Sequence, residues 1–287
     1  MKCPVNCKYC MAQYINSRAN YYNNGGRISI NKTCVAINRD INDKPLKEMN
    51  IPWNLLVGEY IGFQGATDCF NPVYYDDLLW LLNNINNFKI RKLVLCTKMQ
   101  IPEDFLILIK KLNLENSIVF IISTTGLDKF ENTTTSSRID NIRLLKKYEL
   151  DVLPAIHPYI HGVSDISFLN ELSEIGIKYI TWKGFRYNPI MNLDIPKSIL
   201  CRYINTNEEE ILIGEEYLVE MTKLNNLSYI DMKDYVTKDD GKQSLISKEE
   251  AEMQLKELSK FALFSTSSTK EEVLKYRISS RIKNYLR

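Results

Sequence analysis

Three cysteines close to the start of the chain have the spacing of a metal-cluster loop. The segment reads Cys3-Pro-Val-Asn-Cys7-Lys-Tyr-Cys10, which is Cys-x-x-x-Cys-x-x-Cys. Three thiolates this close in sequence can bind three irons of a [4Fe–4S] cluster and leave the fourth iron without a protein ligand. Such an open iron can bind and reduce a small molecule as well as pass electrons. We therefore predict that these cysteines are the ligands of one [4Fe–4S] cluster.

A zinc site completed by a remote residue, or surface cysteines without any metal, are the alternatives. Structural zinc sites are usually closed by four ligands, commonly as two cysteine or histidine pairs. No second pair of that type is present in the sequence, where the remaining candidates are Cys34, Cys69, Cys96, Cys201, His157 and His161. Because Cys201 stands alone in the last third of the chain, we also expect no auxiliary cluster.

Short apolar runs alternate with stretches of helical periodicity over the first two thirds of the chain. This pattern predicts parallel strands joined by helical crossovers, and hence an α/β fold of the partial (βα)6-type TIM barrel. Active residues should lie at the carboxyl ends of the strands, in residues 64–68, 97–98 and 123–125, and at His157 and Lys183. The predicted strands are 60–64, 92–97, 117–123, 152–156 and 178–182, and the predicted helices are 72–87, 103–112, 138–148 and 166–175.

The apolar rhythm changes after about residue 190. Residues 207–224 and 247–262 resemble charged amphipathic helices, with a polar loop at 237–242. We therefore expect a barrel domain at 1–190 and a mainly helical extension or cap at 191–287.

Composition indicates an ordinary globular protein. The 287 residues are 45% hydrophobic and 25% charged, with a net charge of +2, so nothing in the charge balance demands nucleic acid. No apolar run approaches the roughly 20 residues of a membrane-spanning helix, and no signal peptide is evident. Seven cysteines in such a chain favour metal or redox chemistry in a reducing cytoplasm over a disulfide framework.

The cysteine spacing, with Tyr9 before the last cysteine, resembles the signature of the radical S-adenosylmethionine superfamily. Further motifs are similar in order and spacing to its spore photoproduct lyase and DNA-repair-photolyase-like branch. The resemblance implies that the open iron binds S-adenosylmethionine and cleaves it reductively to a 5′-deoxyadenosyl radical, which abstracts hydrogen from a substrate in a lyase-like or other radical reaction. The motifs are Tyr-Cys-Met-Ala at 9–12, Gly-Ala-Thr-Asp at 65–68, Asn71-Pro72, Thr97-Lys98, Ser-Thr-Thr at 123–125, Arg138, and residues 154–165.

The same resemblance implies cofactor-binding roles for six residues. Tyr9 and Met11 would lie near the adenine. The ribose or methionine end would contact Asp68, Lys98 and Ser123, with Arg138 assisting. A carboxylate can accept from ribose hydroxyls, and a cationic side chain can pair with the methionine carboxylate. Structural roles remain open for the charged residues: a helix cap, a solvated loop residue and an ion pair on a helix face.

The chain departs from this branch in two places. The family normally has a barrel strand before the cluster loop, but only two residues precede Cys3 in this sequence. Either the barrel is open on that side, or another segment, such as residues 34–38, fills its edge. Spore photoproduct lyase has a hydrogen-donating cysteine at the position of Gly65. Here Cys69 and Cys96 are the candidate hydrogen donors, with small buried hydrophobes as the alternative.

The substrate is an unidentified organic molecule, for which the resemblance favours a nucleotide or nucleic acid. A small metabolite or a peptide is the alternative, because a fold does not fix the substrate. An electron donor such as flavodoxin or ferredoxin is expected as a partner, and no membrane is. From another class, a non-catalytic zinc- or cluster-stabilised binding protein stays open. Weaker pointers to a polyanion are Tyr14, Tyr21 and Tyr22 with Arg18 and Arg27, and the basic tail 270–287.

Overall fold

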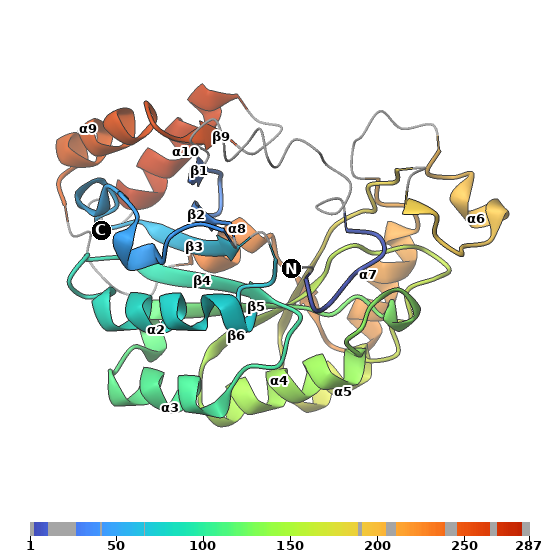
Figure 1. Ribbon diagram of the computed structural model, residues 1–287. Coiled ribbons are helices and arrows are strands. Elements are labelled where there is room, and N and C mark those ends of the chain that lie inside the picture. The colour runs from blue at the N-terminus through green and yellow to red at the C-terminus, as the bar shows by residue number, and fades with distance from the viewer. Residues whose placement is uncertain are drawn as a thin grey trace.

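A computed structural model describes most of the chain (Figure 1). The described residues are 3–10, 27–40, 42–65, 67–188, 191–204, 211–238, 246–264 and 269–282. Within these ranges, no helix is both long enough and apolar enough to cross a membrane.

The fold is built on one nine-stranded sheet with the strand order β8-β7-β6-β5-β4-β3-β2-β1-β9. Neighbouring strands are parallel throughout, except for the antiparallel pair β1 and β2. The sheet does not close on itself, which is consistent with a partial α/β barrel. The strands are β1 Ile28–Ile30, β2 Val35–Arg39, β3 Tyr60–Gly65, β4 Lys92–Thr97, β5 Ile118–Ser123, β6 Asp151–Ile156, β7 Tyr179–Trp182, β8 Ser228–Tyr229 and β9 Leu263–Phe264.

Helices α2 to α5 cover one face of the sheet, which we call the outer face (Figure 1). Each crossover helix buries an apolar stripe against the strands, such as Phe105, Leu106 and Ile109 of α3. The helices are α2 Tyr75–Asn84, α3 Glu103–Lys111, α4 Thr135–Lys147, α5 Leu169–Glu174, α6 Lys197–Leu200, α7 Glu215–Leu224, α8 Met232–Val236, α9 Lys248–Leu258 and α10 Lys270–Ile282.

The five predicted strands and the four predicted crossover helices are all present, with small shifts at their ends. Residues 34–38, one of the two alternatives for the open side of the barrel, form most of β2, which runs parallel to β3 with Val35 opposite Ile61 and Arg39 opposite Gly65. In the sheet β2 is followed by β1 and β9, so it is an internal strand. The short strands β1, β8 and β9 were not predicted, because two or three residues carry no periodic signal.

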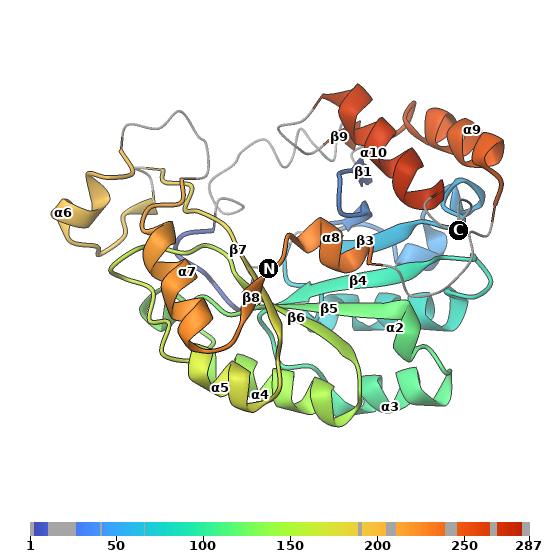
Figure 2. The ribbon, with the colours of Figure 1, turned by 180° about the vertical axis from the view of Figure 1, so that it is seen from behind.

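The opposite face of the sheet, the inner face, has its own small apolar core. Its strand residues include Val94, Val119, Ile121, Leu153 and Ala155. Helix α8 lies against this face (Figure 2), where the Tyr235 hydroxyl donates to the Asp151 carboxylate at 2.5 Å and to the Val152 carbonyl at 2.9 Å. Both acceptors lie at the start of β6, so α8 covers the amino-terminal end of the inner face.

The residues after 190 contribute to both edges of the sheet as well as to helices. Strand β8 pairs with β7 at one edge, and β9 pairs with β1 at the other. Helix α10 is held by a buried ion pair between Arg277 and Glu59, whose side chains are both fully buried. Arg277 also donates to the Thr33 carbonyl at 3.2 Å. The basic tail 270–287 was a weaker pointer to a polyanion, but its central arginine, Arg277, is in the protein interior.

Candidate functional site

The cysteine loop, residues 3–10, lies on the segment that follows β5. Lys8 N donates to the Phe130 carbonyl at 2.8 Å, and Asn132 N donates to the Val5 carbonyl at 2.8 Å. Two tight turns shape the loop: Asn6 N bonds Cys3 O at 3.1 Å, and Cys10 N bonds Cys7 O at 3.0 Å. Backbone bonds therefore fix the position of the loop independently of its thiols.

The three thiols of this loop differ in burial. Cys7 is buried, while Cys3 and Cys10 are half-buried, and none forms a disulfide. Burial raises the pKa of Cys7 to about 12, and the charge of Lys98 opposes this rise. The metal-free thiol is thus protonated at neutral pH, and a metal must displace its proton on binding.

Within the described ranges, no three His, Cys, Asp or Glu side chains lie close enough to share one metal ion. In a cubane cluster of this kind, three thiolates bind three different irons, so the thiols need not share one ion. Three thiols on one partly exposed loop fit that donor set.

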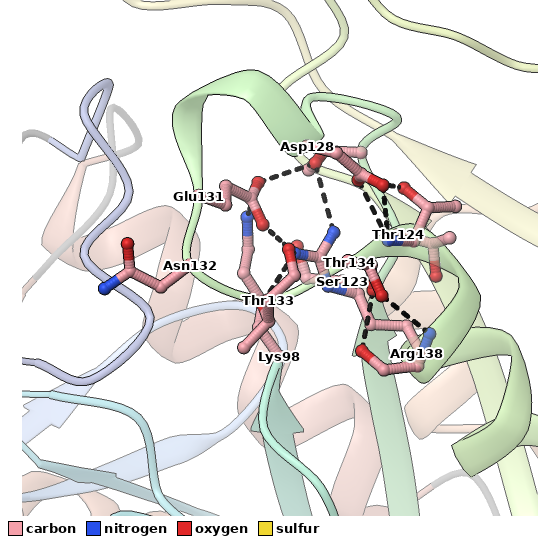
Figure 3. Close-up of polar contacts among 12 residues, drawn as sticks. Lys98, Ser123, Thr124, Asp128, Glu131, Asn132, Thr133, Thr134 and Arg138 are labelled. Carbon is pink, nitrogen blue, oxygen red and sulfur yellow. Dashed lines mark hydrogen bonds and ion pairs between the residues drawn. The ribbon is translucent and has the colours of Figure 1, made fainter.

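A buried carboxylate joins the cysteine loop to the strand ends. Glu131 Oε1 accepts from the hydroxyls of Tyr9 and Thr125 and from Lys98 Nζ, the last at 2.9 Å. Its other oxygen accepts from the Arg138 guanidinium, which also donates to Thr133 (Figure 3). We call Glu131, Tyr9, Lys98, Thr125 and Arg138 the Glu131 network. It connects the cysteine loop, the end of β4, the loop after β5 and helix α4.

The Glu131 network carries more positive than negative charge. Burial lowers the pKa of Lys98 to about 8 and that of Arg138 to about 10. Burial also raises the pKa of Glu131, but the ammonium and guanidinium groups in contact with it stabilise its charged form. With all three groups ionised, one positive charge is in excess beside Cys7. Cationic side chains next to a cysteine favour its thiolate.

Asp68 lies at the carboxyl end of β3, and its carboxylate already has three donors. Oδ1 accepts from Thr97 Oγ1 at 2.6 Å and from Phe70 N at 3.0 Å, and Oδ2 accepts from Lys98 N at 2.7 Å. Burial raises the pKa of Asp68, and these donors oppose the rise. The carboxylate thus joins the ends of β3 and β4 and positions the backbone of Lys98.

The two candidate hydrogen-donor cysteines lie on opposite faces of the sheet. Cys69 packs in the outer core, and its thiol donates to the Cys96 carbonyl at 3.2 Å. Cys96 is exposed and lies on the inner face, since Val94 two residues before it is an inner-face residue. Ser123 also faces inward, and its hydroxyl donates to the His157 carbonyl at 3.2 Å.

The two histidines have different surroundings. His157 follows β6, and its Nε2 is buried with no hydrogen-bond partner in the described part of the chain. Burial lowers its pKa to about 3, assisted by the charges of Lys183 and Lys98. His161 instead belongs to a contact with α7: its Nδ1 lies 3.0 Å from the Tyr159 hydroxyl, and its ring packs against Tyr217.

Several predicted residues lie outside the described ranges. These are Met11, Tyr14, Arg18, Tyr21 and Tyr22. Arg27, which was weighed as a phosphate contact, pairs with Asp43 at 2.5 Å.

Sequence reasoning missed Glu131, although the structure places it between three of the predicted residues. Its loop, residues 126–134, has two acidic residues, Asp128 and Glu131, and nothing in the local sequence distinguishes them. The only sequence signal is a carboxylate after a predicted strand end, where active residues of a barrel gather.

The similarity between this chain and known proteins is weak. No protein-family model matches the chain. No curated protein matches it either. One solved structure, the crystal structure of Streptococcus suis SuiB, is similar with a TM-score of 0.42 and 13% sequence identity. The similarity covers 60% of this chain and 38% of that chain.

Proposed function

We propose that this protein is a radical S-adenosylmethionine enzyme with one [4Fe–4S] cluster. The observation that carries the proposal is the cysteine loop held at the carboxyl-terminal mouth of a parallel sheet, beside the positively charged Glu131 network. When bound, the cluster and S-adenosylmethionine would supply a 5′-deoxyadenosyl radical for hydrogen abstraction from an organic substrate. Cys3, Cys7 and Cys10 would hold the cluster. An electron donor of the flavodoxin or ferredoxin type would reduce it.

The network's own part in this function is to position the loop and to supply charge. The Tyr9 hydroxyl donates to Glu131 and accepts from Lys98, which ties the aromatic ring between Cys7 and Cys10 to the strand ends. The excess positive charge stabilises thiolates and their bound cluster. Lys98, Arg138 and Ser123 are candidate contacts for the polar end of S-adenosylmethionine, and Asp68 would act by placing Lys98.

The test is anaerobic reconstitution with iron and sulfide. We expect about four irons per chain, the absorbance of a cubane cluster, and 5′-deoxyadenosine formed from S-adenosylmethionine under dithionite. Replacing Cys7 with Ala should abolish cluster loading and cofactor cleavage. Cys201→Ala is the matched control, because Cys201 is exposed and lies at the end of α6; it should retain both.

A non-catalytic zinc-stabilised protein is the competing outcome of the same experiment. Stoichiometric zinc, with neither cluster absorbance nor 5′-deoxyadenosine, would reject the enzyme. For the substrate, binding of DNA or RNA that weakens steeply with salt would favour a nucleic acid. No binding at low salt would favour a small metabolite or a peptide.

A further inference from the structure

Three reactive side chains lie on the inner face at the carboxyl ends of different strands. Side chains alternate between the two faces of a strand. In β4, Val94 is inward and Leu95 outward, so Cys96 is inward. In β6, Ala155 is inward and Ile156 outward, which places His157 inward.

Lys183 continues the same inner face beyond β7. The strand residues Ile180 and Trp182 pack in the outer core, so Lys183 has the opposite orientation. Its backbone N donates to the Ile156 carbonyl at 3.1 Å, which holds it beside the end of β6. At this carboxyl-terminal end, Cys96 and Lys183 are both exposed.

His157 provides the observation that points to a ligand. Its buried Nε2 has no hydrogen-bond partner within the described ranges. Buried polar atoms nearly always have a partner, and exceptions occur where a water, ion or functional ligand belongs. Burial and the two nearby lysines lower its pKa to about 3. The ring is therefore neutral near pH 7 and can donate one N–H bond.

The charge around this position is positive. Lys98 is compensated by Glu131 at 2.9 Å, whereas Lys183 is exposed and forms no ion pair with any described residue. Asp68 is the acidic group near Cys96, and its carboxylate is occupied by three donors. An exposed ammonium next to an unpartnered imidazole is a suitable arrangement for an anionic oxygen group.

We propose that Lys183 and His157 bind an anionic group of the substrate, a carboxylate or a phosphate, and hold it beside the Cys96 thiol. That the anion belongs to a substrate rests on the proposed function, whereas the anion-binding subsite rests on the placement of these side chains. The ammonium supplies a point charge, and the imidazole supplies a directional donor from the neighbouring strand.

The test uses the Cys96 thiol as a local reporter of charge. The purified full-length chain is treated with iodoacetate, which is anionic, or iodoacetamide, which is neutral, and alkylation of Cys96 is followed by peptide mass spectrometry. Lys183→Gln should lower the ratio of the iodoacetate rate to the iodoacetamide rate about fivefold, as expected for one unit charge several ångströms away. Lys178→Gln is the matched control, because Lys178 is exposed just before the same strand, at its opposite end.

A second arm tests anion binding directly. Inorganic phosphate should slow the iodoacetamide reaction of Cys96 in the wild type, and much less in Lys183→Gln or His157→Gln. On the reconstituted chain, added S-adenosylmethionine should leave this protection intact. If phosphate no longer protects once S-adenosylmethionine is present, the anion position belongs to the cofactor and the substrate assignment is wrong.

Other results would overturn the subsite itself. These are an unchanged alkylation ratio in Lys183→Gln, an equal fall in Lys178→Gln, or no protection by phosphate. The alkylation ratio and the phosphate protection need neither a loaded cluster nor cofactor cleavage; the S-adenosylmethionine arm alone uses the reconstituted chain. The subsite can therefore fail while the proposed function stands, and the proposed function can fail while the subsite stands.

Discussion

Replacing Glu131 with Gln should destabilise the protein strongly. The side chains of Glu131 and Arg138 are fully buried, and that of Lys98 is 13% exposed. The amide keeps the shape but removes the negative charge, which leaves two cationic groups buried around a neutral side chain. Removing one partner of a buried ion pair typically costs 3–5 kcal/mol. With a urea m-value of about 3 kcal/mol/M, the unfolding midpoint should fall by roughly 1 to 1.7 M.

The matched control is Glu171→Gln. Glu171 pairs with Arg143 at 2.8 Å, but both side chains are about half exposed, at 48% and 49%. Exposed pairs of this kind contribute about 0–1 kcal/mol, so the control should change the midpoint by less than about 0.3 M. Both variants are measured by urea unfolding of the metal-free chain, followed by circular dichroism.

A double variant separates charge from packing. Adding Lys98→Met to Glu131→Gln removes one of the two uncompensated cations, and we expect it to recover about 1 kcal/mol or more of the loss. A Glu131→Gln variant no less stable than Glu171→Gln would refute the reasoning that the buried network stabilises the fold. Lack of any recovery in the double variant would show that lost packing, and not charge, causes the effect.

Three further predictions concern other parts of the chain. Arg277→Met should cost about 3–5 kcal/mol in urea unfolding, because it leaves Glu59 buried without its cation, whereas Lys275→Met on the exposed side of α10 should cost almost nothing. The pKa of His157 is lowered to about 3 in the folded protein, so unfolding takes up a proton below about pH 6.5. The free energy of unfolding should therefore fall from pH 7 to pH 5, and the contribution of His157 to this fall should be absent in His157→Gln. With a disulfide reagent under native conditions, Cys96 should react at least about tenfold faster than Cys69, since Cys69 is buried and needs local unfolding to react; equal rates would contradict the placement of the two thiols on opposite faces.

The strands and crossover helices could be predicted because buried positions are occupied by apolar residues at strand or helix spacing. Ile118–Ser123 is buried at every position, and α3 repeats its apolar residues at helical spacing. The edges of the sheet could not be predicted in the same way. Ser228–Tyr229 is exposed on both residues, and its backbone pairs with β7, where the Tyr229 ring also packs on Trp182 at 4.3 Å between centroids. Backbone hydrogen bonds between strands do not depend on the type of side chain, so the sequence of such a short strand does not predict its pairing.

The residue types of the candidate site could be predicted from the sequence, but the partners of its polar side chains could not. Cys3, Cys7 and Cys10 stand out by spacing, and Lys98 stands out by its place after a strand. Which partner a polar side chain chooses depends on tertiary packing. Asp68 accepts from three local donors, and Arg138 pairs with Glu131 across the network. Direct contacts of Asp68, Lys98, Ser123 and Arg138 with a cofactor stay predictions.

The docking of the cysteine loop has a consequence for how the protein is made. Tyr9 and Glu131 are separated by 122 positions, so the loop cannot take its place until the chain has been extended past β5. At about 5–20 residues per second, translation of that stretch takes roughly 6–25 s. Throughout that time the cysteines lack the surface that later holds them. Insertion of the cluster that we propose would thus follow synthesis of the strands, and these thiols would have to stay reduced in the nascent chain.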